Sequence, residues 1–224
     1  MLALAALIAF PGFAQDEEFD NVVYRSSNDV VRFELVSNFG YGYHILNSTD
    51  FRSNMSDEIF INVATFGLYP VEAVGIELGL DVYFSDFSSR SHAFQLNQDR
   101  RVQAMDFSQL VPGTLDRHYG SFDVFSLNVP LLLKFRAGSF WVGGGAVGSL
   151  NLAGSTHYFY RMDNRRVEVS ERKAQLNTLT YGLAATLGYK GLGLYFKYYP
   201  KTSRLLPEGS VDMNYMTLGV IFDF

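Results

Sequence analysis

The last nine residues, 216–224, alternate strictly between apolar side chains and side chains that are mostly small or polar. The positions between the apolar ones carry Thr217, Gly219 and Asp223, with Ile221 as the exception. Lipid covers the outer face of a transmembrane β-barrel, whereas a soluble sheet rarely leaves one face apolar and uncovered. The pattern predicts a barrel strand with one face in lipid, formed by Met216, Leu218, Val220, Phe222 and Phe224.

Composition agrees with a β protein of one domain. The chain has 224 residues, of which 16% are aromatic and 20 are glycine. The formal net charge is −5 and no run of Lys or Arg is present, so nucleic-acid binding is not expected. The chain has 0 Cys, which excludes disulfides and thiolate metal sites. The sequence predicts no cofactor and no metal site.

The first residues resemble a secretory signal peptide. Residues 1–10 are nearly all Leu, Ala and Ile, and an acidic segment follows Ala14. This predicts a signal peptide at 1–14, a periplasmic lead-in at 15–29 and an outer-membrane barrel at 30–224. No Lys or Arg precedes the apolar run, so a truncated start or an uncleaved anchor stays open. No other stretch approaches the about 20 apolar residues of a membrane helix.

The alternating pattern recurs along the chain in eight segments. Tight turns at Pro70, Gly138 and Gly191 fall on one rim, and long segments fall on the other. The sequence therefore predicts an all-β fold: an eight-stranded antiparallel up-and-down transmembrane β-barrel with short periplasmic turns and long external loops. The strands are expected at about residues 30–44, 58–69, 73–84, 122–135, 140–152, 177–189, 192–199 and 216–224.

Three expectations concern the detail of these strands. Pro130 removes a ladder donor, so a local break is expected in the strand at 122–135. Residues 85–121 are expected to form a long loop, with a hairpin around 97–100 as one possibility, and 155–171 a polar hairpin above the membrane. In the strand at 58–69, the outward residues are expected to be Ile59, Ile61, Val63 and Thr65.

Charged residues alternate with the apolar ones on several strands. Carboxylates such as Glu77 and Asp81 cannot be buried in a dry core without partners, but they fit inside a polar barrel. Eight strands enclose a space just wide enough for side chains to fill. We therefore expect a charge network that plugs the interior, with Glu77 and Lys134 as its first pair; a proton or ion path is the alternative. Its members are Arg32, Glu34, Glu77, Asp81, Lys134 and Lys197.

One stretch carries a resemblance to a known family. Residues 127–135 run Leu-Asn-Val-Pro-Leu-Leu-Leu-Lys-Phe. This resembles the central strand of the small OmpA-like, porin-family barrels of the bacterial outer membrane, although Asn128 stands where an acidic residue is usual. Residues 140–148 and the last strand are also similar to that family. The resemblance implies an eight-stranded barrel in the outer membrane, with Phe222 and Phe224 as a signal for the barrel-assembly machinery.

Catalysis has one candidate constellation. Ser155 and His157 share a strand face, and lipid-modifying barrels use such groups, but no acidic residue that would orient the histidine is evident. The remaining histidines, His44, His92 and His118, are expected in or beside external loops, without zinc-ligand spacing. No nucleophile elbow, P-loop or dinucleotide fingerprint is present. The sequence therefore predicts no catalytic residues.

Four functions remain in view. The first is a non-enzymatic outer-membrane barrel with an anchoring, structural or loop-mediated binding role, and the second an accessory subunit of a larger outer-membrane complex. The third is a lipid-modifying enzyme. The fourth is a soluble lipocalin-type carrier, which needs the opposite polarity and is disfavoured by Glu77 and Asp81. Expected partners are membrane lipid, lipopolysaccharide, the barrel-assembly machinery and, for the second function, a larger complex. The arginines of the external loops either contact lipopolysaccharide or only keep the loops hydrated.

Overall fold

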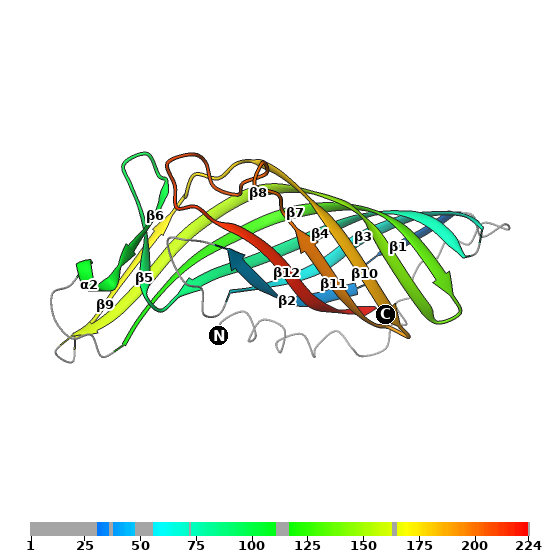
Figure 1. Ribbon diagram of the computed structural model, residues 1–224, viewed down its shortest axis with the longest axis horizontal. Helices are drawn as coiled ribbons and strands as arrows, with labels where there is room; N and C mark the ends of the chain where they lie inside the picture. Colours follow the sequence, from blue (N-terminus) through cyan, green and yellow to red (C-terminus); the bar gives the residue numbers. More distant parts are fainter. Residues whose placement is uncertain are drawn as a thin grey trace, which may run out of the picture.

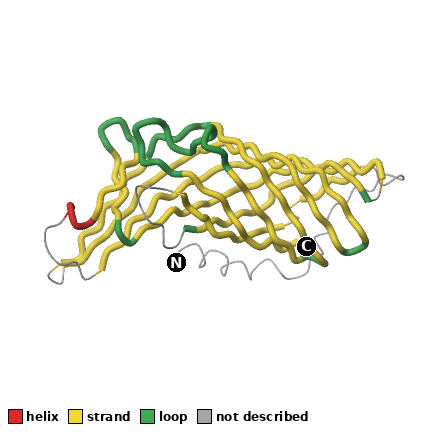
Figure 2. Tube along the Cα trace, viewed as in Figure 1, coloured by secondary structure: helices red, strands yellow, loops and turns green. Residues whose placement is uncertain are grey.

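The computed structural model describes residues 31–35, 38–47, 56–71, 73–110, 117–162 and 165–223. Most of these residues lie in antiparallel β-strands that wrap around an elongated interior (Figures 1 and 2). Eight of the strands form a ring: β2 (Asn38–Asn47), β3 (Asp57–Val71), β4 (Val74–Ser89), β7 (Arg117–Ala137), β8 (Phe140–Met162), β10 (Leu179–Tyr189), β11 (Leu192–Tyr198) and β12 (Asn214–Asp223).

The ring follows the order of the chain. Each of these strands pairs antiparallel with the next one, from β2 through β12. The last strand, β12, pairs with β2 from Asn214 opposite Asn47 to Asp223 opposite Asn38. The predicted all-β, antiparallel arrangement of eight strands is therefore confirmed.

The first predicted strand is divided. β1 (Val31–Leu35) and β2 both pair with β3. Leu35 lies opposite Ala64, whereas Phe39 lies opposite Ile61, so four steps on one strand match three on the other. The two pairings with β3 therefore differ in register by one residue, which the sequence pattern, treating residues 30–44 as one strand, does not show.

A β-bulge at Val63 changes which residues of β3 face outward. Asn62 pairs with Asp81 and Ala64 with Leu80, so Val63 is the extra residue. After an inserted residue the period-2 pattern changes phase. Ile61 and Val63 are exposed as expected, but the outward positions beyond them are Phe66 and Leu68. The expectation that Thr65 points outward was wrong: its side chain hydrogen-bonds to Asn62 on the inward face.

Several strands are longer than predicted. Residues 85–89 continue β4 and residues 117–121 begin β7, so the long loop expected at 85–121 was wrong at both ends. Its middle contains the hairpin that had been considered around 97–100, formed by β5 (His92–Leu96) and β6 (Val102–Asp106), followed by the short helix α2 (Phe107–Leu110). The polar hairpin expected at 155–171 is the upper part of β8 paired with β9 (Arg165–Arg172).

Pro130 interrupts only one side of β7. Pairing with β4 skips from Leu78 opposite Leu131 to Asp81 opposite Asn128, without a change of register. Pairing with β8 continues through Pro130 opposite Val147. The local break expected there is therefore confirmed on the β4 side alone, because the missing N–H of proline costs the ladder one donor.

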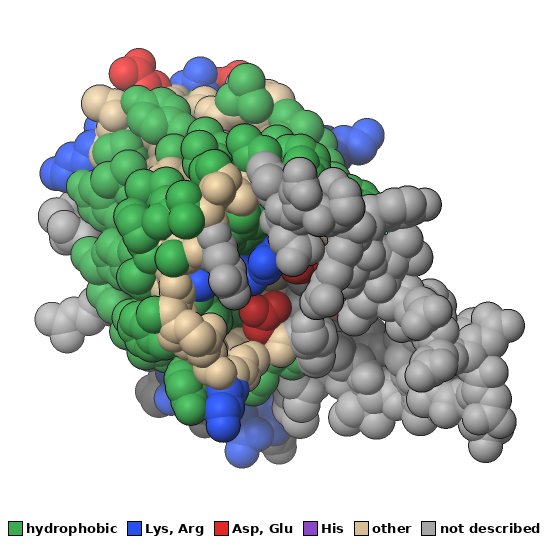
Figure 3. All heavy atoms as spheres, turned by 90° about the vertical axis from the view of Figure 1, so that its right-hand side faces the viewer, with side chains coloured by type: hydrophobic (Ala, Val, Ile, Leu, Met, Phe, Trp, Pro, Cys, Tyr) green, Lys and Arg blue, Asp and Glu red, His purple; other side chains and the backbone are tan. Residues whose placement is uncertain are grey.

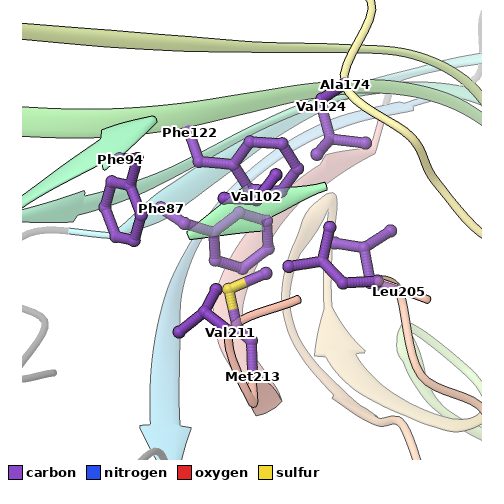
Figure 4. Close-up of a cluster of buried hydrophobic side chains, with 10 residues drawn as sticks. Phe87, Phe94, Val102, Phe122, Val124, Ala174, Leu205, Val211 and Met213 are labelled. Carbon is purple, nitrogen blue, oxygen red and sulfur yellow. The ribbon is translucent and has the colours of Figure 1, made fainter. Parts of the chain in front are cut away.

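Two ends of the molecule differ in structure. The tight turns that join β3 to β4, β7 to β8 and β10 to β11 lie together, at the right of Figure 1, and we call this the turn end. The opposite, loop end carries β5, β6, α2 and β9. Its interior is filled by apolar side chains from strands and loops: Phe87, Phe94, Val102, Phe122, Val124, Ala174, Leu205, Leu206, Val211 and Met213 (Figure 4).

The segments predicted at 1–14 and 15–29, and Phe224, lie outside the described residues. Within the described part, no helix has the length and hydrophobicity needed to cross a bilayer.

Candidate functional site

Outward-facing apolar side chains surround the molecule near the turn end. Leu78, Leu131 and Leu218, on three different strands, are 45%, 50% and 51% exposed. Seen from the turn end, hydrophobic side chains form a shell to the left of and above a mouth in which basic and acidic side chains are visible (Figure 3). We call this shell the apolar belt; each ring strand contributes to it, through Tyr43, Ile61, Leu78, Leu131, Val142, Leu183, Leu194 and Leu218 among others.

Inside the belt, Glu77 of β4 is the centre of one cluster. Lys134 Nζ lies 2.5 Å from its Oε2, and Arg136 Nη2 lies 3.0 Å from its Oε1. The hydroxyl of Tyr69 also donates a hydrogen bond to Glu77. The guanidinium of Arg32 lies 4.6 Å from the centre of the Tyr69 ring. The structure thus places the expected Glu77–Lys134 pair in contact.

Glu58 of β3 is the centre of a second cluster, closer to the loop end. Lys197 Nζ lies 2.5 Å from its Oε1, and the Tyr195 hydroxyl donates to the same oxygen at 2.8 Å. Lys197 also lies 3.9 Å from the centre of the Tyr83 ring, so it has both a carboxylate and an aromatic partner. The Glu58 and Lys197 side chains are 2% and 5% exposed, so the pair is fully enclosed.

Asp81 lies on the inward face of β4 and has a different kind of partner. Its Oδ1 accepts a hydrogen bond of 2.7 Å from the Asn62 side chain. Among the described residues it forms no ion pair. It lines a cavity of about 80 Å³ together with Glu77, Lys134 and Lys197. Four of the six residues expected in the interior network therefore border one small cavity.

The other two expected members lie at its margin. Arg32 contacts the network through the Tyr69 ring. Glu34 is half-buried on the same face of β1, opposite Thr65, and forms no ion pair within the described part of the chain.

Sequence reasoning missed three interior residues. Arg136 was assigned to a turn, although it has the same strand parity as Lys134. Glu58 was placed at a strand end next to a loop, although it shares parity with the inward Phe60 and Asn62. His44 was expected near an external loop; it is instead 5% exposed, hydrogen-bonded to Thr217 at 2.9 Å. In each case counting by two along the strand would have placed the residue inside.

The alternation reverses its polarity where the strands leave the belt. Along β4, residues 74–84 put apolar side chains outward and Glu77 and Asp81 inward. Beyond Phe84, the positions on the outward face carry Asp86, which is half-buried, and Ser88, and the inward position between them carries Phe87; Ser88 and Phe87 are both 0% exposed. β7 has the same reversal between residues 117–124 and 125–135. The outside therefore changes from apolar to polar at the same level at which the interior changes from polar to apolar.

A row of carboxylates lies just beyond the belt. Asp57, Asp86 and Asp123 are directly opposite one another on β3, β4 and β7. The Tyr41 hydroxyl donates to Asp57 at 2.7 Å. Burial, together with the neighbouring carboxylates of Asp123 and Asp57, raises the pKa of the Asp86 carboxyl to about 8. Directly opposed like charges destabilise a sheet, so protonation of Asp86 relieves this row.

Above the row, β7, β8 and β9 continue as a projecting sheet. Its inner face packs against β5 and α2 through Ala93, Phe107 and Tyr158. Its outer face carries charged side chains together with Tyr119 and Phe159, and Arg117, Arg161 and Arg166 are directly opposite one another across the three strands. The projecting sheet is thus covered on one side and carries a row of cations on the other.

His157 has the acidic partner that the sequence did not show. Its Nε2 lies 2.9 Å from Glu168 Oε1, and Arg166 Nη2 lies 2.9 Å from Glu168 Oε2. The hydrogen bond with His157, with Arg166 nearby, lowers the pKa of the Glu168 carboxyl. No hydrogen bond among the described residues joins Ser155 to His157. The arrangement supplies an oriented histidine, but it does not hold a nucleophile against it.

Metal binding has no candidate within the described ranges, where no group of three or more His, Asp and Glu side chains is arranged to hold an ion.

Comparisons with known proteins find little. No family model matches the sequence, and no curated protein sequence matches it. Among solved structures, the chain is similar to Ail, the attachment invasion locus protein of Yersinia pestis, with 14% sequence identity. The match covers 84% of this chain and 95% of that one, with a TM-score of 0.37. At this level of similarity, nothing about the function of this chain follows from the match.

Proposed function

We propose that this chain is a non-enzymatic integral protein of the bacterial outer membrane, whose barrel anchors a projecting sheet outside the cell for binding. The turn end faces the periplasm and the loop end faces outward. The interior is plugged by the Glu77 cluster, by the Glu58 cluster closer to the loop end, and by the apolar cluster around Phe87 at the loop end. A plugged barrel serves as an anchor rather than as a channel.

The polarity reversal is the observation that carries this proposal. A soluble barrel would keep polar residues outside and apolar ones inside along its whole length. Here that arrangement holds only beyond Phe84 and Phe125, and the opposite one holds within the belt. The outward apolar run on β7, residues 125–135, has the length of about 9–11 residues that a tilted strand needs to cross a bilayer. The lipocalin-type alternative is disfavoured for the same reason.

Lipid and lipopolysaccharide are the proposed surroundings. The Arg117–Arg161–Arg166 row lies on the outer face of the projecting sheet, continuous with the belt below it. Guanidinium groups pair well with the phosphates of such lipids. The barrel-assembly machinery remains the proposed partner during insertion, with Phe222, which stacks on Phe39 at 4.7 Å, in the final strand.

Two measurements test the proposal together. After detergent extraction, the unheated protein is expected to migrate differently from the boiled protein on a gel, because an intact barrel stays compact in detergent. Cell fractionation is expected to place it with the outer membrane. Identical migration before and after boiling, or recovery in the soluble fraction, would contradict the proposal.

An accessory role in a larger outer-membrane complex is the alternative. A stable partner would co-elute with the full chain from detergent-solubilised membranes, and the chain alone would not. Recovery of the chain alone, at the size of one copy or of copies of itself, supports the anchoring role.

A lipid-modifying enzyme is a second candidate because Glu168 orients His157. Replacing His157 with Gln while following lipid composition tests it. A change in lipid composition that disappears in the variant would favour the enzyme; unaltered lipid composition in both would favour the anchor.

A further inference from the structure

The strand β9 is an edge of the projecting sheet. It pairs with β8 through eight consecutive positions, from Arg165 opposite Met162 to Arg172 opposite Ser155, without a bulge. Within the part of the chain that the structure describes, no strand pairs with its other edge. Six of its eight residues are exposed, and it contains no proline. Such an edge presents unpaired main-chain groups to any strand of matching chemistry.

The charges on β9 favour one strand in particular, which is β9 of a second copy. If two copies pair antiparallel with Glu168 opposite its counterpart, Arg165 of each copy falls opposite Glu171 of the other. In the same register, Val167 falls opposite Val169. Directly opposed residues approach within about 5 Å between Cβ atoms, so each end of the paired segment gains an ion pair and the valines beside its centre gain apolar contacts. At the centre the two Glu168 carboxylates face each other, and each has Arg166 and His157 of its own copy as partners.

Other registers of the β9–β9 pairing are less favourable in their contacts or in their length. A shift by one residue sets the inward face of one copy against the outward face of the other. A shift by two in one direction sets Arg166 opposite Arg172 at both ends. A shift by two in the other direction sets Arg166 opposite Glu168 at two positions, but it leaves Arg165 opposite Val169 and shortens the paired segment from residues 165–171 to residues 165–169. Single surface ion pairs contribute only about 0–1 kcal/mol, so here they select the register while the main-chain hydrogen bonds hold the strands together.

The faces of β9 agree with this register. Glu168 and Arg166 lie on the outer face, where they contact each other and His157. Val169 packs on the inner face against the cluster of Ala93, Phe107 and Tyr158. The Glu171 carboxylate accepts a hydrogen bond from the Leu96 amide at 2.8 Å, which fixes it on that inner face. The two ion pairs and the valine contacts would therefore all form on the inner face, and the outer-face arginines would stay free.

Symmetry decides where the second copy lies. Two antiparallel edge strands are related by a two-fold axis perpendicular to their sheet. Because β8 and β9 continue the wall of the barrel (Figure 1), that axis is perpendicular to the long axis of the barrel. A half-turn about it reverses the barrel, so the two barrels point in opposite directions. Two copies in one bilayer point the same way, so they cannot form this pairing.

We infer that β9 joins two copies of this chain anchored in two facing membranes. The inference rests on the proposed function, because it needs the barrel to be embedded in a bilayer. Each contact is weak, but two facing surfaces engage many copies together, which multiplies the avidity. The projecting sheet is then a self-recognition element that holds membranes together.

Vesicles containing the full chain test this inference. Phosphatidylcholine vesicles labelled with donor or acceptor lipids are mixed, and clustering is followed by energy transfer and light scattering. Wild-type vesicles are expected to cluster. Arg165→Glu and Glu171→Arg each create two like-charge contacts in the paired state, so each is expected to slow clustering at least tenfold.

The two charge reversals complement each other, which makes the test specific. Mixing vesicles that carry Arg165→Glu with vesicles that carry Glu171→Arg restores both opposite-charge contacts, and clustering is expected to return. The double variant should also cluster with itself. Lys201→Glu, an equal change of charge on an exposed residue outside β9, is the control and should cluster like the wild type.

The outcomes separate this inference from the proposed function. Heat-modifiable migration of the vesicle protein shows whether the barrel has inserted. Failure of the wild type to insert would overturn the proposed function and the inference with it. Insertion without clustering overturns the inference alone, as does clustering that is indifferent to both single reversals or that the mixture of reversals fails to restore.

Discussion

Lys197 of β11 extends across the interior and places its Nζ 2.5 Å from Glu58 Oε1 of β3. The two strands are separated in the ring by β2 and β12, so the ion pair ties together parts of the wall that are not neighbours. A charge removed from water in this way is stable only while its partner is present.

Replacing Lys197 with Met leaves Glu58 buried without its cation. We expect this variant to lose about 3–5 kcal/mol in the free energy of unfolding. The double variant Glu58→Gln, Lys197→Met removes both charges and is expected to regain most of that loss. Urea titration of the vesicle protein, followed by fluorescence of Trp141, the single tryptophan, measures both. A double variant no more stable than the single one would show that the pair has no such role.

Stability near the carboxylate row is expected to depend on pH. The pKa of Asp86 in the folded protein is about 8, against an ordinary value near 4, so the folded state holds a proton that the unfolded chain releases between these values. Stability should therefore fall as pH rises from about 4 to about 8. Asp86→Asn removes this dependence and should raise the free energy of unfolding at pH 9 by about 1 kcal/mol or more, with little effect at pH 4.

Asp106→Asn is the matched control for the pH dependence. Asp106 is half-buried, and hydrogen bonds from Ser108 lower its pKa, so removing its charge should bring no gain at pH 9. Equal gains for Asp86→Asn and Asp106→Asn would mean that general charge reduction, and not the row, is responsible.

The strand pattern predicted the ring but not its irregularities. Counting by two assigns Leu78, Leu131 and Lys134 correctly, because β4 and β7 lack bulges there. It fails at Thr65, because the extra residue Val63 changes the phase and nothing in the local composition marks it. A bulge is selected by long-range packing between strands, which a single sequence does not display.

The ends of the strands were misjudged for a related reason. Residues 85–89 still alternate, but the outward positions carry Asp86 and Ser88, and Phe87 faces inward, opposite to the belt. A search for one constant polarity therefore stops at Phe84. Glu58 and His44 were not predicted as interior residues for the same reason. Both were assigned to loop borders, whereas the interior clusters extend to the level at which the polarity changes.

An arginine in the belt should be costly. Leu131 is 50% exposed on the outward face of β7, midway along residues 125–135. If that face contacts hydrocarbon, Leu131→Arg lowers the free energy of unfolding in vesicles by about 2–4 kcal/mol. Ser170→Arg, on the outer face of β9 beyond the belt, should change it by less than about 0.5 kcal/mol. Similar values for the two variants would place Leu131 in water.

The apolar cluster at the loop end should contribute strongly to stability. Phe87 is 0% exposed and stacks on His44, with ring centres 4.5 Å apart. Truncation to Ala leaves a cavity and is expected to cost about 3–5 kcal/mol, again by urea titration. Met105→Ala, at a residue 37% exposed on β6, should cost less than about 1 kcal/mol. A small loss for Phe87→Ala would show that the cluster is loosely packed.

The central claim is that lipid surrounds the belt and polar groups fill its interior. With 0 Cys in the chain, single cysteines at residues 127–134 can each carry a spin label in the vesicle protein. The decisive measurement is the relaxation of these labels by oxygen, which concentrates in lipid, compared with a water-soluble nickel complex. We predict that oxygen dominates at 127, 129, 131 and 133 and not at the positions between them. Nickel dominating at 127, 129, 131 and 133 would contradict the claim.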